Sequence, residues 1–264
     1  IEPSIETSEE VVKPILRPKF DASKFLDSII KLKSPAPMLR PAGTGKTVVN
    51  VRLNKANASI QNLLDRISEA EGITPDKLKQ QGKNISPYDA VYGYNLLTPS
   101  KSVSSMTLKE LFTFQKQLIN ITKGTISGKT STNKGTSAVG KFQVVKESLF
   151  GKGKNDTAEN PGIGSWADVL NLKAADKFTP AVQEKIARLA LKESGYNNYL
   201  SGKKSQAKFL EGIANIWASV ADLSGTNPSG QPTATSAQSL MPLIDNVKNN
   251  GQTIKVNDLM IRKK

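Results

Sequence analysis

An apolar stripe between residues 59 and 72 constrains the fold of this chain more than any other feature. Its members recur at the three- and four-residue spacing of a helix with one buried face: Ile60, Leu63, Leu64 and Ile67. Ser59 belongs to the residue types that cap helix starts, and Gly72 to those that end helices. The pattern therefore predicts a helix over residues 59–72 that packs one face against a hydrophobic core.

Glu71 stands where the next apolar residue of this stripe is due, four residues after Ile67 and in the last turn of the predicted helix. A carboxyl group withdrawn from water near the negative end of a helix dipole has a raised pKa, as a general acid requires. Glu71 is therefore the candidate for chemistry. The alternative is a frayed helix end with Glu71 in water. Asp65 and Glu69 fall on another face of the helix.

Two missing residue types narrow the chemistry. The 264 residues contain no Cys and no His, which excludes disulfides, Ser-His-Asp and Cys-His catalysis and His-rich zinc sites. Carboxylates, Lys, Ser, Thr and Tyr remain, and carboxylate chemistry on sugars is the most familiar class of that kind.

The charge balance indicates an anionic partner. The formal net charge is +14 and the calculated pI is about 9.8, which favours nucleic acid, an anionic membrane face or an anionic cell-wall polymer. The lysines are scattered among Ser, Gly and Asn, so general electrostatic attraction is favoured over base readout. A basic nucleic-acid-binding protein stays open as a reading based on charge alone. No apolar run approaches the ~18 residues of a membrane span, so none is expected.

The first residues differ in composition from the rest. Residues 1–52 start acidic and are then punctuated by prolines, which predicts an extended arm or linker. Residues 41–47 imitate the end of a phosphate-binding loop, but Arg40 stands where that pattern needs Gly. A turn before a short strand at Val48–Val51 is predicted instead.

Residues 53–264 are expected to form one mostly helical domain. Further helices are predicted after a capping box of Thr107 and Glu110 up to Gly124, from Thr179 to Ser194, over residues 205–220 and from Ala237 to about Asn249. A small β-hairpin or irregular lobe is expected at residues 88–95, a helix start after Ser137, and a terminal strand or extended tail at residues 253–256.

Several of these segments have a recognisable order. Residues 64–72 end in Glu71-Gly72, residues 88–93 read Tyr-Asp-Ala-Val-Tyr-Gly, and residues 136–143 end in Gly-Lys-Phe-Gln, followed by residues 215–219 and 251–254. Together, over roughly residues 57 to 258, they resemble the lysozyme-like lytic transglycosylases, the family typified by the endolysin of bacteriophage lambda. That family has a helix ending in Ser-Glu-Gly, a Tyr-Asp-x-x-x-Gly segment and an Ala-Gly-Arg-Tyr-Gln motif. Lys141 replaces its Arg, and Phe142 replaces its Tyr and lacks the hydroxyl.

The resemblance implies an α+β, mostly α, lysozyme-like domain with a small β element and a substrate groove. It implies cleavage of the β-1,4 bond between N-acetylmuramic acid and N-acetylglucosamine in peptidoglycan, with Glu71 as the catalytic acid, 1,6-anhydro products and neither metal nor cofactor. The substrate contacts it implies are Tyr88, Asp89, Tyr92, Gly140, Lys141, Phe142 and Gln143. Gln143 has an alternative role in bridging within the domain. Asp89 is either the second carboxylate of a muramidase hydrolase or a turn-forming residue.

Two readings of the biological role stay open. In the first, the arm anchors a virion- or tail-borne enzyme that opens the wall from the host periplasm, or the enzyme reaches the periplasm from the host cytoplasm at lysis. In the second, the protein is a structural virion or tail component whose lysozyme-like domain is inactive or binds glycan. The expected partners are glycan strands and other virion proteins.

Overall fold

This computed structural model describes residues 45–92, 97–123, 135–228 and 233–260, with side chains from residue 54 onward. The described residues belong to one compact unit. Most of the expected arm, residues 1–44, lies outside the described residues. Its last residues, 45–52, belong to the first described helix.

Helix α2 spans Gly45–Ala70 and carries the predicted apolar stripe. Its start corrects two predictions: residues 48–51 are helical rather than a strand, and Ser59 lies inside the helix. Residue 52, the expected end of the arm, is also helical. Neither Pro nor Gly interrupts residues 46–70, so helix propagation overrides the β preference of three valines. The Ser59 hydroxyl donates to the Lys55 carbonyl at 2.9 Å instead of capping a start.

The stripe on α2 is buried as predicted, because Ile60 is 3% exposed and Leu63, Leu64 and Ile67 are fully buried. The helix also ends as predicted. Gly72 has φ +75°, its N–H donates to the Glu69 carbonyl at 3.0 Å, and the Ile73 N–H donates to the Ser68 carbonyl at 2.9 Å. These paired bonds form a Schellman motif, in which Gly is favoured because it tolerates positive φ.

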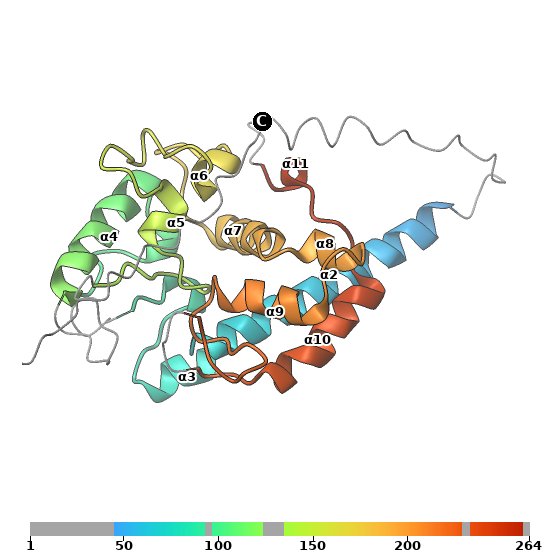
Figure 1. The fold of residues 1–264 in the computed structure, drawn as a ribbon. Coiled ribbons are helices and arrows are strands. Elements are labelled where there is room, and N and C mark those ends of the chain that lie inside the picture. The colour runs from blue at the N-terminus through green and yellow to red at the C-terminus, as the bar shows by residue number, and fades with distance from the viewer. Residues whose placement is uncertain (1–44, 93–96, 124–134, 229–232, 261–264) are drawn as a thin grey trace, which may run out of the picture. The chain divides into compact units, whose positions relative to one another are not determined.

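The remaining described chain is mostly helical (Figure 1). Its elements are α3 (Pro75–Gln80), η1 (Pro87–Asp89), η2 (Val103–Ser105), α4 (Leu108–Thr122), α5 (Lys146–Phe150), α6 (Trp166–Val169), α7 (Pro180–Glu193), α8 (Tyr196–Leu200), α9 (Gln206–Ala214), α10 (Ala237–Asn250) and α11 (Val256–Leu259). The predicted capping box of Thr107 and Glu110 is present at α4, and Thr179 caps α7. The predicted last helix corresponds to α10.

Three predicted elements differ from the structure. The helix expected over residues 205–220 ends at Ala214, and the chain then turns. No helix starts after Ser137, because residues 139–144 form a tight turn. Residues 253–255 form no strand, as in the extended-tail alternative, but α11 begins at Val256, the last residue of the predicted segment. The Asn197 side chain holds this segment by exchanging hydrogen bonds of 2.9 Å with the backbone N–H and carbonyl of Ile254.

β structure in the described chain consists of isolated bridges. Val139 pairs antiparallel with both Val91 and Val144, which joins residues 90–92 to the 139–144 turn. The other two bridges are Thr107–Lys177 and Val220–Thr235. Residues 88–92 thus form a 3-10 turn and one bridge, as in the irregular-lobe alternative, and the rest of the predicted segment, residues 93–95, lies outside the described residues. The small β element of the expected fold is reduced to these contacts.

The core is built on α2, α7 and α10. Helix α10 packs along α2, and Figure 1 shows the two side by side. From α7, Ile186, Leu189 and Leu191 are buried, and the rings of Tyr199 and Phe209 stack at 5.0 Å. Within the described ranges, no helix is long and apolar enough to cross a membrane.

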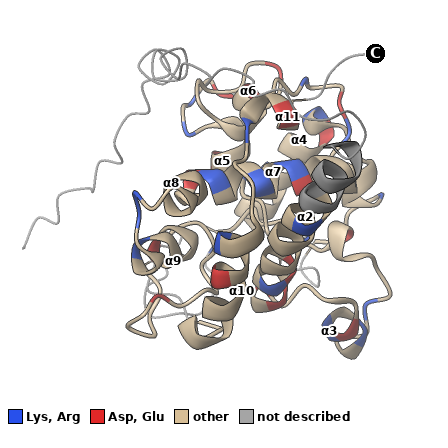
Figure 2. Cartoon of the chain, turned by 90° about the vertical axis from the view of Figure 1, so that its right-hand side faces the viewer, with Lys and Arg blue, Asp and Glu red and all other residues tan. Residues whose placement is uncertain are grey.

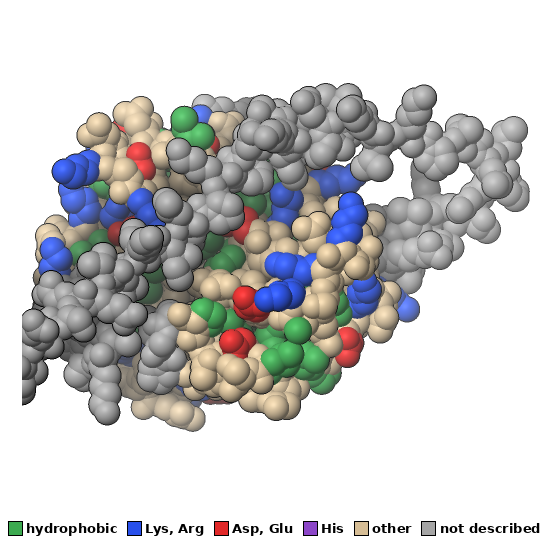
Figure 3. All heavy atoms as spheres, in the orientation of Figure 1, with side chains coloured by type: hydrophobic (Ala, Val, Ile, Leu, Met, Phe, Trp, Pro, Cys, Tyr) green, Lys and Arg blue, Asp and Glu red, His purple; other side chains and the backbone are tan. Residues whose placement is uncertain are grey.

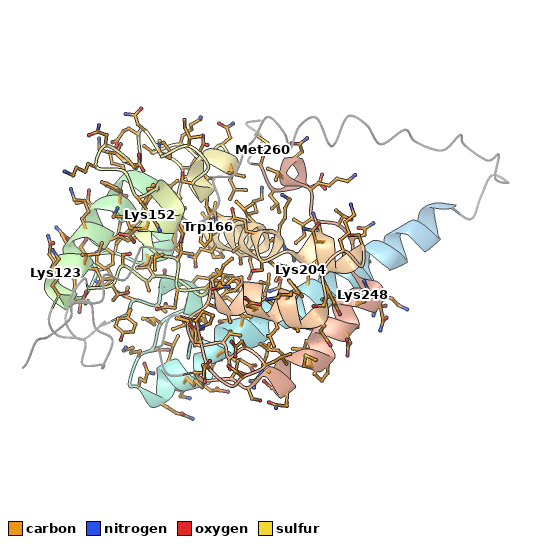
Figure 4. All side chains as sticks on the ribbon, in the orientation of Figure 1. Lys123, Lys152, Trp166, Lys204, Lys248 and Met260 are labelled. Carbon is orange, nitrogen blue, oxygen red and sulfur yellow. The ribbon has the colours of Figure 1, made fainter. Side chains whose placement is uncertain are left out.

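Basic side chains are distributed over several parts of the face shown in Figure 3 rather than gathered in one patch. Two of them, labelled in Figure 4, bind carbonyl oxygens. Lys204 Nζ donates to the Ser194 carbonyl at 2.7 Å, and Lys248 Nζ to the Tyr199 and Leu200 carbonyls at 2.5 and 3.0 Å. Part of the positive charge therefore stabilises the ends of α7 and α8.

Candidate functional site

Glu71 lies at the C-terminal end of α2 and is only partly exposed. Ser219 Oγ donates to Glu71 Oε1 at 2.6 Å, and the Ser219 N–H approaches the same oxygen at 3.5 Å. Burial raises the pKa of Glu71, and the two Ser219 hydrogen bonds offset part of that rise. The perturbation that the helix pattern predicted is therefore present, and the backbone at Glu71 is fixed by the Schellman motif rather than frayed. Its catalytic role stays a prediction.

Ser219 reaches Glu71 because α9 stops early. After Ala214 the chain turns, Trp217 becomes buried with 3% exposure, and Val220 bridges to Thr235. Asn227 fixes this turn from the other side: its Nδ2 donates to the carbonyls of Ala214 and Val220, both at 2.8 Å. Asn227 could not be recognised from the sequence, because an Asn in a Gly/Pro/Ser-rich loop carries no signal that it is buried.

A second polar cluster gathers around Lys141. Lys141 Nζ donates to Asp65 Oδ1 at 2.7 Å and Glu184 Oε1 at 3.0 Å, and lies 5.3 and 5.0 Å from the ring centroids of Tyr88 and Phe142. Tyr88 Oη donates to the same Glu184 oxygen at 2.8 Å. The cluster therefore joins α2, η1, the 139–144 turn and α7.

The charge pattern of this cluster affects its titration. Burial alone lowers the pKa of Lys141, but its hydrogen bonds to Asp65 and Glu184 outweigh burial, and the net direction is upward. Burial raises the pKa of Tyr88, and the hydrogen bond to Glu184 adds to the rise. The ammonium and the phenol therefore keep their protons at neutral pH.

Glu184 is a central member of the Lys141 cluster that the sequence analysis did not single out. Besides Lys141 and Tyr88, Gln61 Nε2 approaches its Oε1 at 3.3 Å, and Arg188 donates to Gln61 Oε1 at 3.2 Å. Glu184 and Arg188 are four residues apart on a helix, a spacing that is typical of an ordinary surface pair. No local signal separates Glu184 from such a pair.

The predicted substrate-binding segment at residues 140–143 forms the tight turn. Gly140 has φ +75°, and a Cβ there would lie 2.2 Å from Gln183 Oε1. Gln183 Oε1 accepts the Lys141 N–H at 3.0 Å, while Gln143 Nε2 donates to the Gly140 carbonyl at 2.9 Å. Phe142 is 3% exposed and belongs to the core. The geometry thus gives Gly140, Phe142 and Gln143 a role in holding the turn, which for Gln143 is the bridging alternative.

Asp89 and Tyr92 are placed differently. Asp89 Oδ1 accepts the Ser104 N–H at 2.8 Å, which ties η1 to η2. This bond joins residues 15 apart in the chain and is not the local bond of an Asx turn, so both readings of Asp89 stay predictions. Tyr92 is 45% exposed.

A hollow of about 600 Å³ adjoins the Lys141 cluster. It is lined by Asp65, Arg66, Ser68, Glu69, Ile73, Thr74, Pro75, Asp76, Lys77, Pro87, Tyr88 and Lys141. Tyr88 and Lys141 are the only predicted substrate contacts among these lining residues, and Glu71 is not one of them. Of the sequence-predicted residues, Glu71 therefore lies at the Ser219 contact and Tyr88 and Lys141 line the hollow, while the other five belong to neither.

Searches of protein-family models, curated proteins and solved structures with this chain find no match. Within the described part of the chain, no group of three or more Asp or Glu side chains is arranged to hold a metal ion. Inference about function therefore depends on the Glu71 environment and on the sequence resemblance.

Proposed function

We propose that the protein is a peptidoglycan lytic transglycosylase that cleaves the β-1,4 bond between N-acetylmuramic acid and N-acetylglucosamine, with Glu71 as its acid and base. The observation that carries the proposal is the environment of Glu71: a carboxyl group at a helix end, its pKa raised by burial, with one oxygen held by Ser219. Glu71 and Ser219 also belong to two of the segments that resemble the family.

In the proposed reaction, protonated Glu71 donates to the glycosidic oxygen as the bond to C1 of the muramic unit breaks, and positive charge develops at C1. Glu71, now a carboxylate, takes the proton of the C6 hydroxyl of the same sugar. The C6 oxygen bonds to C1 and closes a 1,6-anhydro ring. The proton taken from the C6 hydroxyl leaves Glu71 protonated again, and neither water nor a cofactor is consumed. Because Ser219 occupies Oε1, Oε2 is the oxygen that carries the proton.

The engagement of other carboxylates supports a mechanism with one carboxylate. Asp89 accepts a backbone N–H, and Asp65 and Glu184 share the Lys141 ammonium. A hydrolase that uses two carboxylates requires the second to face the scissile bond from across the substrate. Asp89, the candidate from sequence, has Oδ1 bound to the Ser104 N–H, and transglycosylation, which needs no second carboxylate, is the reaction we propose.

The net charge of +14 fits an anionic wall polymer as the place where the enzyme accumulates. Residence in a virion or tail, with action in the host periplasm, is part of the same proposal. The arm that would provide the anchor falls mostly outside the described residues.

The test is digestion of purified murein sacculi with wild type, Glu71→Gln and a control, Glu211→Gln, which removes a carboxylate from the surface of α9. Mass spectrometry of the muropeptides should find anhydro products from wild type and the control and none from Glu71→Gln. Products with reducing ends would identify a hydrolase. Absence of products from wild type would reject the enzyme, and sedimentation with sacculi would then test the glycan-binding alternative.

A further inference from the structure

The hollow lies beside the end of α2 and across a turn from Glu71. Glu69 and Ile73, which flank Glu71 in the chain, both line it, whereas the Glu71 carboxylate binds Ser219. At about 600 Å³ it falls within the roughly 300–1,000 Å³ of small-molecule sites. A ligand bound in it would contact the same turn that positions the proposed acid.

The hollow differs in charge from the chain around it. It is lined by three acids, Asp65, Glu69 and Asp76, and by three bases, Arg66, Lys77 and Lys141, so its formal charge is zero. The chain as a whole has 37 basic and 23 acidic residues. A polyanion is therefore attracted less strongly to this hollow than to the rest of the surface, whereas a ligand that carries both signs of charge is complementary to the lining.

Lys141 and Asp65 at this hollow already bind each other, and the other four charged groups of its lining are open to exchange. Lys141 is 13% exposed and held by two carboxylates, so it forms part of the floor. The Arg66–Glu69 pair, at 2.6 Å, has side chains 36% and 46% exposed, and Asp76 and Lys77 lie exposed on α3. Figure 2 shows both signs of charge on α3. Exposed pairs contribute little to stability, so a ligand can replace one member at small cost.

We propose that this hollow binds the peptide stem of the peptidoglycan strand. Glu69 and Asp76 receive the free ammonium group of the stem, and Arg66 and Lys77 receive its carboxylates. The proposal rests on the proposed function, because it makes the hollow a subsite for the substituent of the muramic sugar. It predicts that the enzyme distinguishes peptide-bearing glycan from bare glycan.

The test compares kcat/KM on peptide-bearing glycan strands with kcat/KM on strands whose peptides an amidase has removed. Wild type should prefer the peptide-bearing strands. Arg66→Gln and Glu69→Gln should each lower this ratio roughly three- to tenfold, the effect of losing one charged or hydrogen-bonding contact. The matched controls are Lys208→Gln and Glu211→Gln, from an i,i+3 pair on α9 that is also 2.6 Å apart and does not line the hollow. They should leave the ratio unchanged.

Calorimetry of a soluble stem tripeptide with Glu71→Gln measures the same site without cleavage. Binding that weakens when Arg66→Gln is added supports the subsite. Equal kcat/KM of wild type on the two glycans, or no heat of binding, overturns it and leaves the proposed function standing. If neither glycan is cleaved, the proposed function fails, and calorimetry still decides whether the hollow binds the stem.

Discussion

Glu71 and Glu184 are both largely withdrawn from water, and they are partnered in opposite ways. Glu71 receives a hydroxyl and a distant N–H from Ser219, whereas Glu184 Oε1 accepts from Lys141, Tyr88 and Gln61. Burial therefore raises the pKa of Glu71 beside a neutral donor, whereas Glu184 forms an ion pair with an ammonium at 3.0 Å. The comparison indicates that Glu71 is suited to exchange a proton and Glu184 to hold an ion pair.

The largest expected effect is on activity at Glu71. Glu71→Gln should lower kcat by roughly 10²- to 10⁴-fold, because the general acid is lost. Glu184→Gln should lower kcat far less. Single-turnover digestion of sacculi measures both. An equal loss in the two variants, with folding intact by circular dichroism, would remove the distinction between the two carboxylates.

The next effect is on stability at Lys141. Lys141→Met leaves Asp65 and the mostly buried Glu184 without their cation, and should cost roughly 2–4 kcal/mol in the free energy of unfolding, somewhat below a fully buried pair. Urea unfolding measures it. Adding Glu184→Gln should recover part of the loss, since the uncompensated charge is removed. A double variant as unstable as the sum of the singles would show that the two residues are not coupled.

Gly140 tests how the turn supports the cluster. Gly140→Ala places a Cβ at positive φ and against Gln183, and should cost roughly 2–3 kcal/mol, whereas Gly82→Ala, at φ +72° with no heavy atom within 4 Å of the added Cβ, should cost about 1 kcal/mol. Thermal unfolding of both variants supplies the measurement. Similar costs at the two sites would mean that strain at positive φ, and not contact with Gln183, explains the glycine.

Glu71 should also make stability depend on pH. Because burial raises its pKa in the folded state, the folded protein is favoured while Glu71 is protonated, which holds fully below the unfolded pKa. This stability is lost as pH rises through the folded pKa, where the carboxylate must form in a buried place. Glu71→Gln should therefore be more stable than wild type at pH 7, by roughly 0.5–2 kcal/mol, and lose that advantage near pH 4. Urea unfolding at the two pH values tests this, and an advantage that grows toward acid would contradict it.

The smallest effect is expected at Ser219. Its hydrogen bonds lower the pKa of Glu71, so Ser219→Ala should raise it further and move the alkaline limb of the pH profile of kcat/KM to higher pH. The control is Ser224→Ala, whose hydroxyl binds Asp222 in the following loop. A shift toward lower pH in Ser219→Ala would show that another group controls that limb.

The local features of the fold could be predicted from sequence because neighbouring residues determine them. Gly72 ends α2 since the Schellman motif needs positive φ, and Thr107, Thr179 and Ser205 cap helices with their own hydroxyls. The errors arose where local signals conflicted. Three valines favoured a strand at residues 48–51, and an apolar run extended α9 beyond Ala214.

The sequence by itself determined the apolar stripe of α2, its end at Gly72 and the acid that interrupts the stripe, because each follows from residues within a few positions of one another. Only the tertiary structure decided the partners: Ser219 meets Glu71 from 148 residues away, and Lys141 meets Asp65 and Glu184 from 76 and 43. Contacts over such separations depend on how α2, α7 and the loops after α9 pack. The pKa of Glu71 therefore depends both on the helix pattern of α2 and on the turn after Ala214 that brings Ser219 to it, where the sequence predicted a continuing helix.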